Sequence, residues 1–114
     1  SLQGLALGLD ALEPAERNRI EVIAGSAGTM ASAALDADVV IADPPRKGLD
    51  RELVEQLVAD PPARFVYVSC GLDSFLADTA RLTISGAMRL SDLRVFNLMP
   101  YTEHVETVAC FERA

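Results

Sequence analysis

The sequence contains no tryptophan, a single lysine and only two cysteines among its 114 residues. The cysteines, Cys70 and Cys110, form no C-x-x-C pair, so the sequence indicates neither a zinc ribbon nor a disulfide-rich secreted scaffold. With 10 basic residues against 17 acidic ones, the formal net charge is -7. An acidic chain lacks the cationic surface with which proteins hold nucleic-acid phosphates, so any contact with nucleic acid needs positive charge from elsewhere.

Long apolar runs and a targeting segment are also missing. The longest stretch without charge, residues 22–35, is 14 residues long and is shorter than the roughly 20 apolar residues of a membrane helix. The N-terminus lacks the basic region of a signal peptide, and free thiols suit a cytoplasmic protein. Half of the chain is hydrophobic and the mean hydropathy is +0.21. These values exclude disorder and predict one globular domain over residues 1–114.

Apolar runs rich in β-branched residues alternate with helix-like segments, which predicts an α/β fold with a mostly parallel sheet covered on both faces. Only residues 100–104 separate the last two strands, too few for a crossover, so these strands should pair antiparallel at one edge of the sheet. Asp50 and Asp73 are expected to be helix N-caps. Strands are expected at 20–24, 39–42, 65–68, 93–98 and 105–111, and helices at 28–35, 50–59 and 73–82.

No glycine-rich G-x-G-x-x-G turn follows any expected strand. Gly25 and Gly28 form only a G-x-x-G pair, which is more typical of a plain turn than of a phosphate-binding loop. Functional residues must therefore be sought at other strand ends.

Two polar side chains follow expected strands. Asp43 comes after four apolar residues and before Pro44-Pro45, which keeps it extended; the alternative is an ordinary strand-ending loop, as at 60–62. Cys70 closes the run FVYVSC before a helix, whose dipole favours the nucleophilic thiolate. The alternative for Cys70, and the preferred interpretation of Cys110, is an inert core cysteine.

A second acid and the only histidine open the final strand. Glu106 and His104 could be a base and its orienting partner, or merely a polar edge. An exposed acid, a thiol and a second acid at one rim of one sheet together suggest covalent catalysis with a separate base.

Three motifs resemble those of the S-adenosylmethionine-dependent RNA uracil-C5 methyltransferases: DPPRKGLD at 43–50, YVSC at 67–70 and MPYTEHVE at 99–106. The resemblance implies that Cys70 is the nucleophile, that Glu106 is the base, and that Asp43 and Ser26 lie in the S-adenosyl-L-methionine pocket, with no metal. Gly71 stands where the family usually carries Asn, and Ala77-Asp78 where it carries Arg-Asp.

The resemblance also implies a fold and a partner. The fold would be the Rossmann-like sheet of class I methyltransferases, truncated at the N-terminus, because its first two strands have no counterpart here. The partner would be tRNA or rRNA, bound through the full-length protein. The fragment alone is expected to bind the cofactor poorly and to be inactive.

Other classes of function are less compatible with the residues. A receiver domain would need a lysine after its last core strand, yet the only lysine is Lys47. An amine N-methyltransferase would carry an aromatic residue after Pro45, where Arg46 stands. A non-catalytic Rossmann-like binding domain stays open as the alternative.

Overall fold

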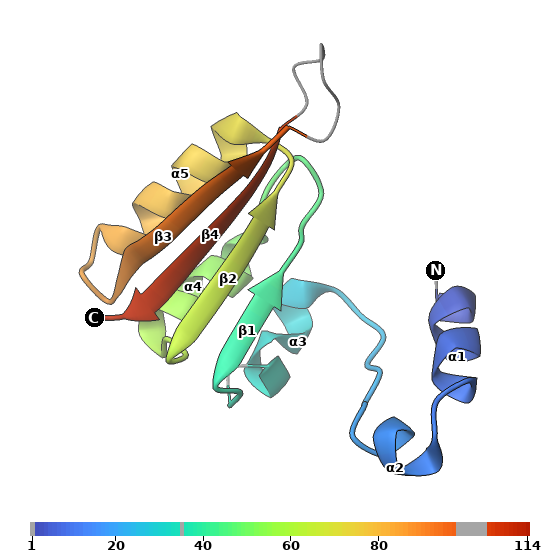
Figure 1. Ribbon diagram of the computed structural model, residues 1–114. Coiled ribbons are helices and arrows are strands. Elements are labelled where there is room, and N and C mark those ends of the chain that lie inside the picture. The colour runs from blue at the N-terminus through green and yellow to red at the C-terminus, as the bar shows by residue number, and fades with distance from the viewer. Residues whose placement is uncertain (1, 35, 98–104) are drawn as a thin grey trace.

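The computed structural model describes residues 2–34, 36–97 and 105–114. A four-stranded sheet in the order β1-β2-β4-β3 forms its centre (Figure 1). The elements are α1 (Leu2–Asp10), α2 (Pro14–Arg17), α3 (Ala27–Ala34), β1 (Val39–Ala42), α4 (Arg51–Ala59), β2 (Arg64–Ser69), α5 (Leu72–Thr83), β3 (Met88–Phe96) and β4 (Glu106–Arg113).

The last strand lies inside the sheet. β1 and β2 pair parallel, while β4 pairs antiparallel with both β2 and β3, so β1, β2 and β3 all run in one direction. The expected antiparallel pairing of the last two strands at one edge of the sheet is confirmed, with β3 as the edge strand and β4 between β3 and β2. β4 buries Thr107, Ala109 and Phe111, whereas β3 buries only Met88, so the more buried strand takes the inner place.

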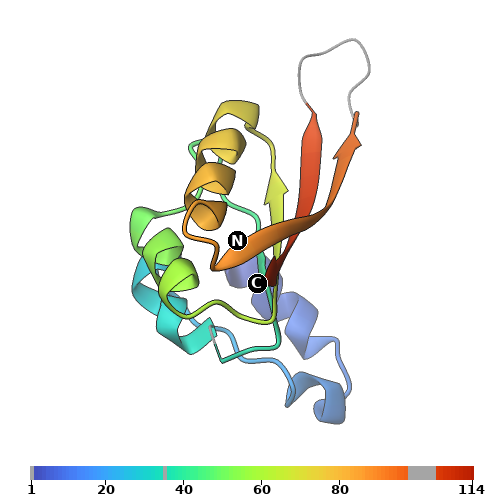
Figure 2. The ribbon, with the colours of Figure 1, turned by 90° about the vertical axis from the view of Figure 1, so that its left-hand side faces the viewer.

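Helices α3, α4 and α5 pack on the same face of the sheet (Figure 2). Side chains at every second position of the strands point to these helices, since side chains alternate along a strand. The buried core contains Ala31, Val40, Leu49, Leu53, Val54, Leu57, Phe65, Tyr67, Phe75, Leu82, Met88, Ala109 and Phe111.

The opposite side of the sheet, called here the open face, carries Val39, Ile41, Val66, Val68, Val108 and Cys110. Ile41 is 69% exposed, and α1 and α2 lie apart from the sheet beyond β1 (Figure 1). The expectation that helices cover both faces is therefore wrong for the described residues. Cys110 is half-buried on this face, so the expectation that Cys110 is a core cysteine is wrong.

The strand expected at residues 20–24 does not form. The segment pairs with no strand, and Ile20, Val22 and Ile23 are each 43–49% exposed. A strand exists only through hydrogen bonds with a neighbour. No described strand lies beside this segment, so its β-branched residues have no neighbouring strand with which to form a sheet.

Asp50 and Asp73 do not cap their helices as expected. Asp50 occupies the N-cap position of α4 without a capping bond; its Oδ2 instead accepts a hydrogen bond from the Gly28 N–H at 3.2 Å. α5 begins at Leu72, so Asp73 lies inside its first turn and Gly71 takes the N-cap position. The Asp50 bond ties the loop before α4 to the first turn of α3.

Candidate active site

Asp43, Cys70 and Glu106 come to one rim of the sheet. Asp43 follows the end of β1, Cys70 follows the end of β2, and Glu106 begins the antiparallel strand β4. The register of β2 with β4 ends at Ser69 and Thr107, and Cys70 and Glu106 are the next residues outward from this pair. Ala42 is registered with Tyr67, so Asp43 lies two residues, or about 7 Å, short of that level.

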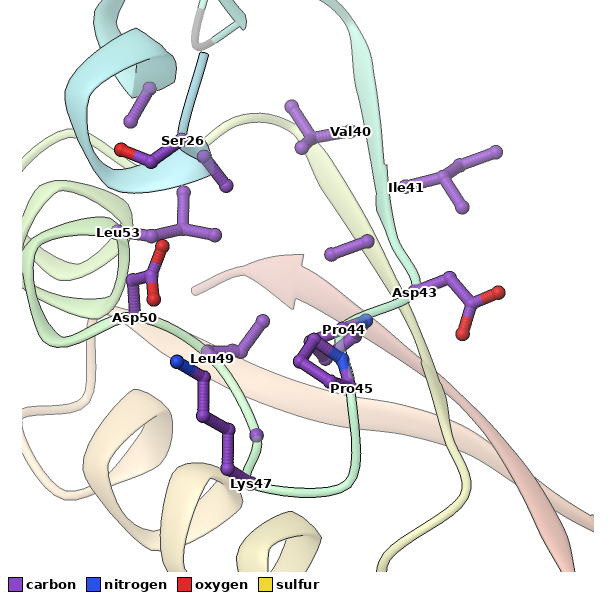
Figure 3. A pocket seen from close by; sticks show the side chains of 14 residues that line it. Ser26, Val40, Ile41, Asp43, Pro44, Pro45, Lys47, Leu49, Asp50 and Leu53 are labelled. Atoms are coloured by element: carbon purple, nitrogen blue, oxygen red, sulfur yellow. The ribbon is translucent and has the colours of Figure 1, made fainter. Parts of the chain in front are cut away.

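Strand alternation also assigns these side chains a common side. Figure 3 shows Asp43 pointing the same way as Ile41 and away from Val40, Leu53 and Ser26. Glu106 shares the alternation of Val108 and Cys110, and continuing β2 by one residue puts Cys70 with Val66 and Val68. Cys70 and Glu106 are both half-buried, and Asp43 is exposed. The three functional groups thus lie at the rim of the open face.

Ser26 stands apart from this group and is used by a helix cap. Its Oγ accepts from the Thr29 N–H at 3.3 Å and lies 2.8 Å from Thr29 Oγ1, at the start of α3. The Gly25-to-Gly28 segment is thus a turn that begins a helix, as the plain-turn interpretation has it.

A pocket of about 570 Å³ joins Ser26 to the loop after β1. Its walls are mostly aliphatic, with a few polar groups, a composition typical of ligand sites. Asp43 lines its rim, but the carboxylate points away from Ser26 (Figure 3). The lining residues are Ser26, Ala27, Ala31, Val40, Ile41, Ala42, Asp43, Pro44, Pro45, Lys47, Gly48, Leu49, Asp50 and Leu53.

Asp78, named from the sequence only with Ala77 in the comparison with the family, is a buried acid beside the rim. Its side chain is only 5% exposed, and its Oδ2 accepts hydrogen bonds from the Tyr67 hydroxyl at 2.7 Å and from the Leu49 N–H at 2.9 Å. Burial and the bond to Asp78 raise the pKa of Tyr67 far above its ordinary value. The sequence signal was available, because Asp78 falls on the same helical stripe as the buried residues Phe75 and Leu82.

A second set of bonds shapes the turn that carries Cys70. Ser69 Oγ donates to the Gly71 carbonyl at 3.0 Å and accepts from the Gly71 N–H at 3.2 Å. Ser74 Oγ, one turn into α5, donates to the Arg46 carbonyl at 2.7 Å, with the Gly71 carbonyl a further acceptor at 3.1 Å. Helix α5 therefore contacts both loops of the rim.

Some expectations fall elsewhere. His104 and most of the 99–106 motif lie outside the described residues. In the parts of the chain that the structure describes, no group of three His, Cys, Asp or Glu could hold a metal ion. Across the same residues, every helix is too short or too polar to cross a bilayer.

Relatives of this chain are RNA methyltransferases by name. Residues 28–114 match the model of the tRNA (uracil-5-)-methyltransferase family. An uncharacterized RNA methyltransferase of Protochlamydia amoebophila is 41% identical over 95 residues, which is 83% of this chain and 24% of that protein. One from Enterococcus faecalis is 37% identical over 112 residues, 92% of this chain and 24% of that protein. The chain thus spans about a quarter of the length of these relatives.

Two solved structures are similar to this chain. The Pyrococcus abyssi tRNA (uracil-54, C5)-methyltransferase, crystallised with S-adenosyl-L-homocysteine, is 39% identical with a TM-score of 0.59, over 65% of this chain and 18% of that one. M1.HpyAVI, at 16% identity and a TM-score of 0.51 over 75% of this chain and 48% of that one, supports the fold alone. Because the family model matches well over half of its residues, the chain belongs to the tRNA (uracil-5-)-methyltransferase family.

Proposed function

We propose that this chain supplies the nucleophile and the base of an RNA uracil-C5 methyltransferase. The observation that supports the proposal is the register of β2 and β4, which ends with Ser69 opposite Thr107, so that Cys70 and Glu106 are the next residues outward at the same rim. A thiol and a carboxylate on neighbouring strands can act on adjacent carbons of one flat ring. Family membership favours this function over a receiver domain or a non-catalytic binding domain.

The pocket beside this rim suits part of S-adenosyl-L-methionine, the proposed cofactor. Aliphatic side chains such as Val40 and Leu53 offer a surface for a flat base, and Ser26 and Asp50 offer polar groups at its mouth. Asp43, at the rim between this pocket and Cys70, would lie where cofactor and uracil meet. The bound cofactor would supply an electrophilic methyl group on a sulfonium.

The chemistry assigns separate steps to the two side chains. Uracil C5 is a weak nucleophile, so the Cys70 thiolate first forms a bond to C6, which moves electron density onto C5. After C5 has gained the methyl group, the Glu106 carboxylate accepts the C5 proton. The electron pair of that C–H bond then restores the C5=C6 double bond, and the Cys70–C6 bond breaks with its electrons returning to sulfur.

The wider setting belongs to the same proposal. The mixed sheet would be the C-terminal part of a Rossmann-like methyltransferase domain, and the rest of the intact protein would complete the cofactor site and bind tRNA or rRNA in the cytoplasm. The acidity of this chain supports the assignment of RNA binding to other parts of the intact protein, because a net charge of -7 does not favour binding to phosphates.

The test uses the intact protein that contains this chain, with RNA and S-adenosylmethionine. Cys70→Ala should abolish turnover and leave no adduct that survives denaturation. Glu106→Gln should form a methylated protein–RNA adduct that accumulates, because losing a positioned base slows its step by about 10²- to 10⁴-fold.

Cys110→Ala is the matched control, since it removes the other thiol of this chain and should turn over as wild type does. An adduct formed by Cys70→Ala, or full turnover by Glu106→Gln, would show that the roles are wrongly assigned.

A further inference from the structure

Helix α5 contacts two loops of the rim, one that carries Asp43 and one that carries Cys70. The first loop, residues 43–50, follows β1; the second, the Cys70 turn of residues 70–71, follows β2 and leads into α5. Neither loop has a regular element of its own. Hydrogen bonds from α5 join both loops to one helix.

We propose that Asp78 and Ser74 are positioning residues that clamp the 43–50 loop onto the Cys70 turn. This rests on the proposed function, because it is the separation of Asp43 from Cys70 that the clamp would fix. Asp78 holds the far end of the loop through the Leu49 N–H, and Ser74 holds its middle through the Arg46 carbonyl. Tyr67 anchors Asp78 to β2 from the other side.

The backbone packing at two glycines shows how closely the clamp fits. A Cβ added at Gly48 would lie 2.6 Å from Asp78 Oδ2 and 3.0 Å from Ser74 Cβ. A Cβ added at Gly71 would lie 2.6 Å from the Arg46 carbonyl oxygen. Only a backbone without side chains at both points lets the loop, the turn and α5 come together.

Burial strengthens the Asp78 bond of the clamp, whereas the Ser74 bond to Arg46 is exposed. Asp78 and Leu49 are 4% and 8% exposed, so water cannot replace their hydrogen bond without opening the loop. An ion pair contributes little here, because the Arg81 guanidinium is 3.9 Å from Asp78 Oδ1 and is itself 60% exposed. The role of Asp78 is therefore to accept hydrogen bonds in a fixed place, and not to supply charge at the rim.

Substitutions in the intact protein, followed by hydrogen exchange and mass spectrometry, test the clamp. Ser74→Ala and Asp78→Ala should each speed exchange of the peptide 44–50 by at least about tenfold. Ser74→Thr and Asp78→Asn keep an oxygen at the same place and should restore slow exchange. Thr83→Ala is the matched control, because it removes a 2.8 Å side-chain bond to a backbone carbonyl on the same helix, away from both loops.

Turnover separates positioning from mere stability. Ser74→Ala should lower kcat by about tenfold to a hundredfold, as small misplacements of reacting groups do, and leave KM for RNA unchanged. Ser74→Thr should recover kcat. If Asp78→Ala unfolds the protein, exchange will also be faster in peptide 64–69 of β2. In that case the comparison of Ser74→Ala with Ser74→Thr tests the clamp.

The two proposals fail in different ways. Unchanged exchange in peptide 44–50 of Ser74→Ala, or faster exchange with unchanged kcat, would overturn the clamp as a positioning device. A wild-type protein that transfers no methyl group would refute the proposed function, and exchange would still decide whether the clamp holds the loops.

Discussion

Gly48→Ala is the substitution for which the structure gives the most definite expected cost. Gly48 has a φ of +94°, in the region that residues with a Cβ rarely adopt. Placing alanine there costs about 1–2 kcal/mol in the backbone. The new Cβ would also meet Asp78 Oδ2 at 2.6 Å. Asp78 cannot give way without losing its bond to Tyr67 or Leu49, and a hydrogen bond to a charged group is worth about 1.5–3 kcal/mol.

The two costs add to about 2.5–5 kcal/mol of the free energy of unfolding. Gly86→Ala is the matched control, because Gly86 has a φ of +79° and no atom within 4 Å of its added Cβ. That variant should lose only the backbone share, about 1–2 kcal/mol. Urea denaturation of residues 1–114, followed by circular dichroism, measures both free energies of unfolding.

A double-mutant cycle identifies the source of the difference. In an Asp78→Ala background, Gly48→Ala should cost less than it does in the wild-type background, because the obstructing oxygen is gone and only the 3.0 Å contact with Ser74 Cβ stays. Equal losses for Gly48→Ala and Gly86→Ala in the wild-type background would refute the close approach of the loop to α5.

Two further predictions test burial at single positions. Burial and the bond to Asp78 raise the pKa of Tyr67 above its ordinary 10.0, so the stability that Tyr67 contributes is complete below pH 10 and is lost above it. Above pH 10 the free energy of unfolding of the wild type should therefore fall relative to that of Tyr67→Phe by about 1.4 kcal/mol per pH unit. Free energies of unfolding that change with pH in parallel in the two proteins would contradict this. Val40 is 9% exposed and Ile41 is 69% exposed. Val40→Ala should therefore lower the free energy of unfolding by about 2 kcal/mol, and Ile41→Ala by less than about 0.5 kcal/mol. Equal losses in urea denaturation would mean that the open face is covered.

Local patterns predicted every strand of the described sheet, although not all of the bounds. The strand at 39–42 has the expected bounds, and β2 and β4 differ from the expected 65–68 and 105–111 by no more than two residues at either end. The expected strand 93–98 is wrong at its start, because β3 begins five residues earlier, at Met88. Apolar β-branched runs form strands wherever a neighbour is available. Residues 20–24 have the same composition and no neighbour, so composition alone could not decide their structure.

The order of the strands and the bonds of the site depend on contacts between distant segments. Loop length predicts that the last two strands pair, but not that β4 lies between β2 and β3. A cap rule places Asp50 at the start of α4, but its carboxylate binds an amide 22 residues earlier in the chain. The clamp of Asp78 spans 29 residues to Leu49, a distance at which no local rule applies.

The period-two geometry of β2 separates positioning from chemistry. Tyr67 and Ser69 are themselves buried and point to the helices, where Tyr67 donates to the buried Asp78 and Ser69 bonds the Gly71 backbone. Cys70, the next residue in the alternation, falls on the other side, at the rim of the open face. Under the proposed function, a nucleophile bound into the core would be held rigidly but hidden from an RNA base. The bonds of Ser69 to Gly71 instead hold the residues on either side of Cys70, so the proposed positioning residues on α5 and the proposed reacting groups at the rim belong to different elements.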